Sequence, residues 1–349
     1  MSKKDYVGQE FYHSPFVVKE FNGMPYRYLG KSGLKVSNVG LGTWKMGYPD
    51  SGDGSRIGES EAFTIFDKAI ELGVSFWDTA NRYNSASGNS ERIIGKWFNQ
   101  NPDQRRNVVL ASKMAGTMDG LSPNHCGLSR LNIMESVYAS LERLQTDHLD
   151  LLYFHAFDAG TPPEESLLAI EDLVKQDLVR YFAVSNFTVE QLETYQAIQK
   201  QLSARSRILA VQNQFDVLDG EGEAFPGVLP FAAKNDVSFI AWSPMARGLL
   251  TDKYLDMSKI GPGDRLYDEG DLNIKASPEN MEKLRSLGAI SREMGVELGQ
   301  LVIAYMLTLK GMGPLIPSSS NVKQLEANAA AGKIELSEEQ IKKINHILK

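Results

Sequence analysis

Short apolar runs and amphipathic segments alternate along most of the chain. Runs of β-branched or aromatic residues are typical of buried strands, whereas apolar residues spaced three and four apart predict helices. Strands are predicted at about 37–42, 74–78, 107–113, 149–155, 180–185, 208–214, 237–242 and 313–316. Helices are predicted at about 60–72, 90–100, 129–145, 164–176, 188–202, 224–235, 279–295 and 321–331. Eight such units favour an α/β fold of the closed (β/α)8 TIM barrel type over a doubly wound sheet, which usually has five or six strands.

The beginning of the chain departs from this alternation. Residues 1–24 are polar and aromatic without a clear period, so we predict an N-terminal extension followed by a single barrel domain over 25–349. At the start of that domain, two alternating segments flank a glycine-bearing turn at 30–33, a pattern that predicts a β-hairpin over 26–37.

Two further features lie outside the eight units. The long segment from Pro244 to Ala276 has no hydrophobic period, and loops of that length in compact domains are usually lids or binding loops. Additional helices are predicted near 296–310 and at 337–348, where they would pack outside the barrel.

Composition narrows the class of protein. The chain of 349 residues is 42% hydrophobic and 23% charged, which is close to globular averages. A net charge of -7 argues against a nucleic-acid partner, because phosphate binding needs a concentrated basic surface. The apolar runs are far shorter than the roughly 20 residues that span a bilayer, so no membrane segment is expected.

The N-terminus and the cysteine content point to the cytoplasm. The first residues lack the apolar core of a secretory signal, so we expect no export. The single cysteine, Cys126, excludes an intrachain disulfide and a thiolate metal cluster, and fits a reducing compartment. We interpret Cys126 as a loop thiol rather than a nucleophile.

Four residues that can hold or move a proton lie at or just beyond the ends of successive strands. Asp78, Lys113 and His155 end three of the predicted strands, and Tyr83 follows the first. Carboxyl ends of barrel strands meet on one face, where barrel enzymes place their active sites. The four residues are therefore predicted to form a catalytic site.

These four side chains suggest a specific chemistry. A tyrosine has a pKa of about 10, and a neighbouring ammonium from Lys113 would lower it. Asp78 would hold that ammonium, and His155 would hydrogen-bond a substrate oxygen. Such a set could protonate a carbonyl oxygen while a hydride arrives from elsewhere. Taken singly, Asp78 would more often be a turn cap, and His155 could be a satisfied core histidine.

Other motifs bear on the cofactor. The glycines from Gly40 to Gly47 have the wrong spacing for a dinucleotide fingerprint, and no metal-ligand or hydrolase motif occurs, so no metal is expected. The segments 243–248 and 317–321 follow the last two strands, where barrels often bind phosphate. Trp242 offers a flat face for a nicotinamide ring, although core packing explains a lone tryptophan as well.

The chain resembles the aldo-keto reductase superfamily from about Tyr26 to its end. The resemblance is carried by Tyr28–Ser37, Gly40–Trp44 with Gly42 and Thr43, Asp78–Tyr83, Ser112–Lys113, Ala139–Gln145, Ser185–Phe187, Trp242–Thr251 and Gln324–Asn328. It implies that Tyr83 is the general acid/base, that Lys113 and Asp78 tune its pKa, and that His155 orients the carbonyl.

The same resemblance implies how NADP(H), or alternatively NAD(H), would bind. Ser185, Asn186 and Gln212 would contact the carboxamide of the nicotinamide, and Trp242 would stack under its ring. The further residues expected to bind the cofactor are Gly42, Thr43, Trp44 and Asp78. The pyrophosphate would lie along Ser243, Met245, Arg247 and Lys253. The adenosine half would contact Ser318, Ser320, Gln324 and Asn328.

Three positions depart from the common family pattern. Ala156-Phe157 follows His155 where Trp-Pro is frequent, which alters the substrate pocket. Ser318 and Gln324 stand where many members carry a Lys and an Arg for the 2′-phosphate, so the choice between NADP and NAD stays open. Trp242 stands where many members have a Tyr that stacks on the nicotinamide. In this position the chain is similar to the branch that contains the β subunits of voltage-gated potassium channels.

Two functions follow as hypotheses. The first is a cytoplasmic NAD(P)H-dependent oxidoreductase that interconverts a small-molecule aldehyde, ketone or sugar and its alcohol. The second is a cofactor-binding regulatory subunit that senses redox state, like the channel subunits. His155 favours the enzyme, because the resemblance implies Asn at that position in the channel subunits. The oligomeric state is not predicted.

Overall fold

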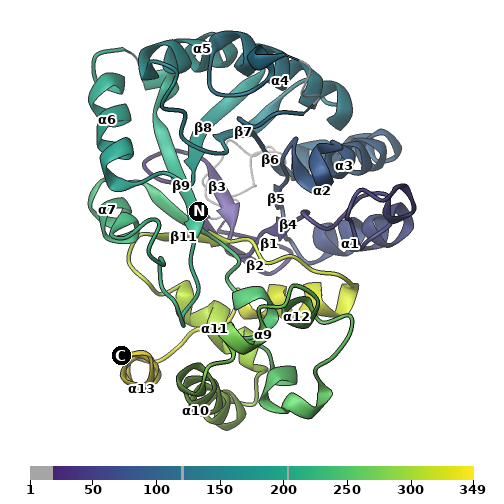
Figure 1. The fold of residues 1–349 in the computed structure, drawn as a ribbon, viewed down its shortest axis with the longest axis vertical. Coiled ribbons are helices and arrows are strands. Elements are labelled where there is room, and N and C mark those ends of the chain that lie inside the picture. The colour runs from purple at the N-terminus through teal and green to yellow at the C-terminus, as the bar shows by residue number, and fades with distance from the viewer. Residues whose placement is uncertain (1–18, 119–121, 203) are drawn as a thin grey trace, which may run out of the picture.

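A closed barrel of eight parallel strands forms the centre of the computed structural model, which describes residues 19–118, 122–202 and 204–349 (Figure 1). Its strands are β4 (Leu41–Gly42), β5 (Phe76–Asp78), β6 (Val109–Met114), β7 (Leu149–Phe154), β8 (Val179–Ser185), β9 (Ile208–Gln214), β10 (Ser238–Trp242) and β11 (Met312–Leu315). Each strand pairs with the next in chain order. The barrel closes where Gly40 N donates to Leu315 O at 2.7 Å and Leu315 N to Asn38 O at 3.1 Å. The predicted fold class is confirmed.

The strands are apolar because both of their faces are buried. In β7, Leu151 and Tyr153 belong to the cluster inside the barrel, whereas Leu152 and Phe154 belong to the cluster between strands and helices. Successive side chains of a strand point to opposite faces, so one short run of apolar residues supplies both layers.

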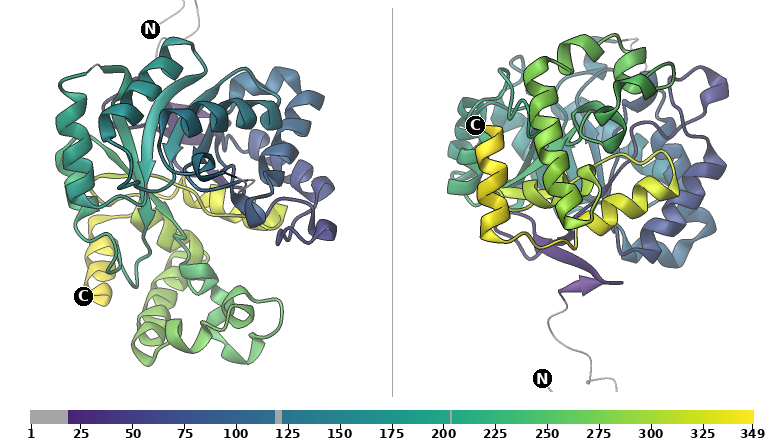
Figure 2. Two further views of the ribbon diagram at one scale, coloured as in Figure 1. Left: turned by 45° about the horizontal axis from the view of Figure 1, so that its top comes forward. Right: turned by 90° about the horizontal axis from the view of Figure 1, so that it is seen from below.

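The predicted helices are present with boundaries within a few residues. They are α1 (Glu59–Glu71), α3 (Asn89–Gln100), α4 (Arg130–Leu144), α5 (Pro163–Lys175), α6 (Val189–Gln199), α7 (Val228–Lys234), α10 (Pro278–Met294), α11 (Leu298–Met306), α12 (Val322–Ala331) and α13 (Glu338–Leu348). Side-chain caps fix several starts, for example Thr188 at α6 and Asn321 at α12. α10 and α13 pack together outside the barrel (Figure 2).

The helix predicted at 224–235 begins later than expected. Gly227 precedes it with a φ of 79°, a left-handed conformation that ends the preceding loop and starts α7 at Val228.

The long segment from Pro244 to Ala276, which was predicted as a loop, contains several short helices. It contains three short 3-10 helices, η7 (Ala246–Gly248), η8 (Asp252–Leu255) and η9 (Met257–Lys259), and two short α-helices, α8 (Arg265–Asp268) and α9 (Leu272–Lys275). Each piece is too short to repeat an apolar position, so periodicity cannot detect it. Local turns hold them, as where Gly261 N donates to Asp264 Oδ2 at 3.0 Å.

The predicted hairpin covers the amino end of the barrel. β2 (Met24–Tyr28) and β3 (Lys35–Ser37) pair antiparallel, and β1 (Glu20–Phe21) adds a third strand. Arg27 Nη1 donates to the carbonyls of Met312 and Gly313, each at 3.0 Å. The boundary at residue 25, between the N-terminal extension and the barrel domain, stays a prediction.

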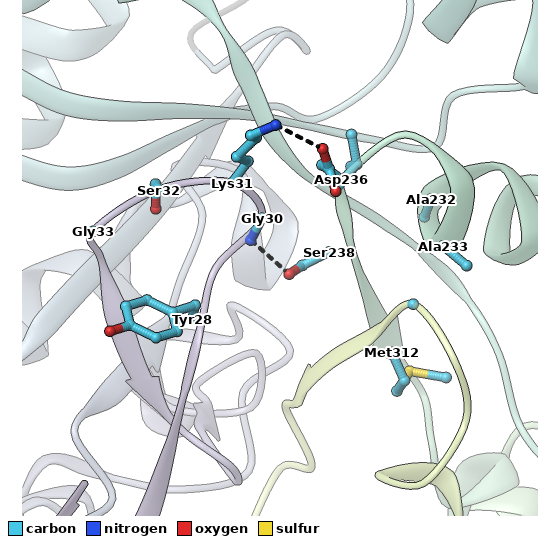
Figure 3. A pocket seen from close by; sticks show the side chains of 12 residues that line it. Tyr28, Gly30, Lys31, Ser32, Gly33, Ala232, Ala233, Asp236, Ser238 and Met312 are labelled. Carbon is cyan, nitrogen blue, oxygen red and sulfur yellow. Dashed lines mark hydrogen bonds and ion pairs between the residues drawn. The ribbon is translucent and has the colours of Figure 1, made fainter.

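A hollow of about 710 Å³ lies beside the turn of this hairpin, between it, α7 and β10 (Figure 3). Among the residues that line it, Gly30 N donates to Ser238 Oγ at 2.8 Å and Lys31 pairs with Asp236. None of the four candidate catalytic residues lines this hollow. Within the described residues, no helix combines the length and apolar character needed to cross a bilayer.

Candidate active site

The four candidate catalytic residues meet at the carboxyl end of the barrel. Asp78 is the last residue of β5, Lys113 lies near the end of β6, and His155 follows β7 directly. Tyr83 begins α2 (Tyr83–Ala86), a short turn after β5. The parallel pairing of β5, β6 and β7 therefore brings together side chains that are far apart in sequence.

Lys113 is the centre of this group. Its side chain is fully buried, and its ammonium donates to Asp78 Oδ1, to Thr79 O at 2.9 Å and to Tyr83 Oη at 2.7 Å. All three ammonium donors thus have acceptors, which is the condition for burying a charged group without a large penalty. The contact with Thr79 O is a backbone interaction that sequence patterns did not indicate.

Asp78 is held from both sides. Its Oδ1 also accepts from Tyr83 Oη at 3.3 Å, and its Oδ2 accepts from Gln212 Nε2 at 2.9 Å. Gln212 was predicted only as a cofactor residue. Its hydrogen bond to Asp78 joins β9 to β5 across the barrel, and no local sequence signal reports a contact between residues 134 positions apart.

The pKa of Tyr83 shifts opposite to the prediction. Burial and the neighbouring Asp78 carboxylate raise it well above its usual value. The predicted net lowering of the Tyr83 pKa is therefore wrong for this arrangement, because burial and the Asp78 carboxylate outweigh the ammonium of Lys113. The pKa of Lys113 is lowered by burial, against the opposing effect of Asp78. Tyr83 is thus a neutral phenol at neutral pH, the form that can donate a proton.

His155 faces Tyr83 edge-on, with ring centroids 6.1 Å apart. Burial, followed by the positive charges of Lys113 and Arg82, lowers the pKa of His155 to about 3. The imidazole is therefore neutral over the physiological range and carries one N–H donor.

The residues predicted to contact a nicotinamide form one network beside this group. Ser185 Oγ donates to Gln212 O at 2.8 Å, and Asn186 Nδ2 donates to His155 O at 2.8 Å. Trp242 Nε1 donates to Asn186 Oδ1 at 3.1 Å, which fixes the indole ring at the end of β10. Amide groups beside a flat aromatic face are the chemistry that a nicotinamide ring with its carboxamide requires, so these residues fit that group.

The predicted phosphate-channel residues lie in the segment after β10. Ser243 and Arg247 have left-handed backbones, with φ of 60° and 58°. Arg247 pairs with Glu269 at 3.4 Å and with Asp271, while Lys253 pairs with Asp264. Met245 touches the neighbouring helix at Gly299. Both cations therefore have carboxylate partners that an entering pyrophosphate would have to replace.

The residues predicted for the adenosine half surround the start of α12. Ser320 and Gln324 are joined by a hydrogen bond, in which Ser320 Oγ donates to Gln324 Oε1 at 2.8 Å. Asn328 Nδ2 donates to Ser319 Oγ at 3.1 Å. Ser318 lies beside β4, bridged to Gly42.

The predicted residues after Gly42 line the same end of the barrel. Thr43 is buried and its hydroxyl donates to Asp78 O at 3.0 Å. Two cations lie over the Trp44 ring, with Lys45 Nζ at 3.9 Å and the Arg265 guanidinium carbon at 4.5 Å from its centroid. The contact with Arg265 ties the long segment after β10 to the loop after β4.

One buried tyrosine at the site was missed by the sequence interpretation. Tyr153 lies on β7 inside the barrel, with its ring centroid 5.7 Å from Lys113 Nζ. Burial and the Asp78 charge raise its pKa well above the usual value, so it stays neutral. In the sequence Tyr153 is one residue of an apolar run, and that run does not indicate that the Tyr153 side chain points into the barrel near Lys113. In the described part of the chain no cluster of acidic, histidine or cysteine residues could hold a metal ion.

Comparison with known proteins identifies the family. The model of the aldo/keto reductase family matches residues 38–349. The chain belongs to the aldo/keto reductase family. It is 34% identical over 335 residues to the uncharacterized oxidoreductase YrpG of Bacillus subtilis, covering 93% of this chain and 96% of that protein.

Two further relatives of this aldo/keto reductase carry different names. A probable voltage-gated potassium channel subunit beta of Arabidopsis thaliana is 30% identical, covering 88% of this chain and 91% of that protein. The L-glyceraldehyde 3-phosphate reductase of Escherichia coli O157:H7 is 27% identical, covering 94% and 93%. The predicted kinship with both reductases and channel subunits is confirmed.

Proposed function

We propose that this aldo/keto reductase is an NAD(P)H-dependent enzyme that interconverts a small-molecule carbonyl compound and its alcohol. The observation that carries the proposal is the buried contact of Lys113 Nζ with both Asp78 and the hydroxyl of Tyr83. A buried ammonium against a phenol has no structural need that an apolar pair would not meet as well, so it argues for chemistry at the phenol.

In this proposal Tyr83 donates its proton to the carbonyl oxygen during reduction. An alkoxide is a much stronger base than a phenolate, so a phenol with a raised pKa still protonates it. Lys113 stabilises the phenolate left behind, since its ammonium lies 2.7 Å from the oxygen. His155, neutral at its lowered pKa, donates its N–H to the same carbonyl oxygen and orients it.

The bound nicotinamide would supply the hydride. The network of Ser185, Asn186 and Trp242 would hold the ring, and Arg247 and Lys253 would turn from their carboxylates to the pyrophosphate. NADP(H) is favoured by the family resemblance. Ser318 and Gln324 carry no positive charge for a 2′-phosphate, so NAD(H) is the alternative that a direct test must compare.

A second function, cofactor binding in a regulatory subunit, is favoured by the similarity to the plant channel subunits. His155 and the complete Asp78–Tyr83–Lys113 group speak for turnover instead. Both functions require the cofactor, so only the carbonyl step separates them.

The test has two stages. Titration of tryptophan fluorescence with NADPH and with NADH should show saturable quenching by at least one of them, because Trp242 lies where the ring is expected. The complex is then assayed with sugars, aliphatic aldehydes and quinones. Turnover of one class supports the reductase. Quenching without turnover of any class would support the regulatory subunit, and no quenching would exclude both functions.

A further inference from the structure

Arg82 lies between Asp78 and Tyr83 in sequence, and among the residues that the structure describes none neutralises its charge. Its Nε donates to Thr117 O at 2.9 Å, the contact that anchors the side chain. Within the described residues, no carboxylate lies within 4.0 Å of the guanidinium. Its two terminal nitrogens therefore keep donors available to a ligand.

The loop after β6 leaves room for this guanidinium. A Cβ on Gly116 would lie 2.4 Å from Arg82 Nη1 and 2.5 Å from its Cδ, so a side chain there would displace the arginine. The absence of a side chain at Gly116 and the carbonyl of Thr117 together fix where the exposed arginine rests. The side chain is thus preorganised although it is open to solvent.

The guanidinium lies beside Gly116, two residues after the end of β6, at the same end of the barrel as the catalytic group. Its charge, after that of Lys113, contributes to the low pKa of His155, so it is within electrostatic reach of the imidazole. The two cations differ in one respect. Lys113 is paired with Asp78, whereas the partner that the described residues offer Arg82 is the neutral carbonyl of Thr117.

We propose that Arg82 binds a carboxylate or phosphate carried by the carbonyl substrate, so that the preferred substrates are anionic aldehydes or ketones. This inference rests on the proposed reductase function. The planar guanidinium offers parallel N–H donors that match a carboxylate or phosphate in a bidentate fashion. An anion held there, one residue from Tyr83, would place the rest of the substrate beside the proton donor.

The experiment compares matched pairs of substrates in the wild-type protein and in Arg82→Gln. Glyceraldehyde is paired with glyceraldehyde 3-phosphate, and butanal with succinic semialdehyde. The wild type should have the higher kcat/KM for the anionic member of at least one pair. Arg82→Gln should lower the ratio of anionic to neutral kcat/KM by about 10- to 100-fold, mostly through KM. Whichever pair responds identifies phosphate or carboxylate as the anion.

Two variants serve as controls. Arg92→Gln removes one exposed positive charge from α3 and should leave every ratio unchanged, which excludes a general effect of net charge. Arg82→Lys should lose part of the preference, because a lysine keeps the charge but lacks the fork.

The outcomes distinguish failure of the inference on Arg82 from failure of the proposed reductase function. An equal loss for neutral and anionic substrates in Arg82→Gln would mean that Arg82 only anchors the loop at Thr117, and the inference would be overturned. A wild-type preference for the neutral members would overturn it too, while the reductase proposal would stand. Failure of both classes with either cofactor would instead remove the proposed function, and this inference with it.

Discussion

The two ends of the barrel use left-handed backbone and buried charge differently. At the amino end, left-handed conformations fall mostly on residue types that tolerate them, such as Gly30, Gly73 and Asp236, with Gln145 as an exception. At the carboxyl end they fall on tolerant residues such as Asn84 and Asn186, but also on Ser85, Ala86, Ser243 and Ala246, which have no such tolerance. Backbone strain of this kind persists where function requires a fixed geometry.

Buried charge differs between the two ends in degree, because the amino-end ion pair of Arg105 and Asp150 keeps 15% and 11% of its side-chain surface exposed. The fully buried ion pair of Lys113 and Asp78 lies at the carboxyl end. At the amino end, Arg27 is partly buried and satisfies its donors with backbone carbonyls and Asn38 rather than with a carboxylate. The comparison indicates that the amino end provides stability and the carboxyl end provides chemistry, as in other barrels.

The largest effect is expected for Lys113→Met. The change leaves the Asp78 carboxylate buried without its partner, which should lower the free energy of unfolding by about 3–5 kcal/mol. It should also lower kcat by about 10²- to 10⁴-fold. Urea unfolding and steady-state kinetics measure both. The control Lys96→Met removes an exposed pair with Glu59 and should change neither strongly. Normal stability in Lys113→Met would mean that the buried pair is not formed.

Arg27→Met tests the other end of the barrel. Loss of the charged donor leaves the Met312 and Gly313 carbonyls unpaired, at a cost of about 2–3 kcal/mol of unfolding free energy. The kcat/KM of the folded fraction should be unchanged. A loss of activity without a loss of stability would contradict the division between the two ends.

His155→Gln gives a smaller effect that depends on pH. The folded-state pKa of His155 is lowered to about 3, so between pH 3 and about 6.5 the unfolded chain binds a proton that the folded protein does not. This residue therefore destabilises the wild type increasingly as the pH falls through that window. Relative to wild type, the variant should gain about 1.4 kcal/mol per pH unit below pH 6. Parallel stability curves from pH 7 to pH 4 would show that His155 is not desolvated.

Sequence patterns predicted most of this fold and the composition of the catalytic group. The strand and helix periods gave all eight units, because burial on two faces or one stripe leaves a direct trace in residue order. Short helices such as α8 leave no such pattern, because a segment of four residues is too short to show a repeat of apolar positions. The bond from Gln212 to Asp78 and the pKa of Tyr83 depend on which side chains meet across the barrel, and residue order alone does not contain that information.

The role of Tyr83 as proton donor is the central claim, and Tyr83→Phe tests it most directly. The matched control is Tyr26→Phe at the amino end, where the hydroxyl donates to Ser75 Oγ at 2.5 Å and has no contact with the catalytic group. The account predicts that Tyr83→Phe lowers carbonyl reduction by about 10²- to 10⁴-fold with cofactor quenching retained, while Tyr26→Phe keeps full turnover. Carbonyl reduction by Tyr83→Phe within tenfold of wild type would contradict it.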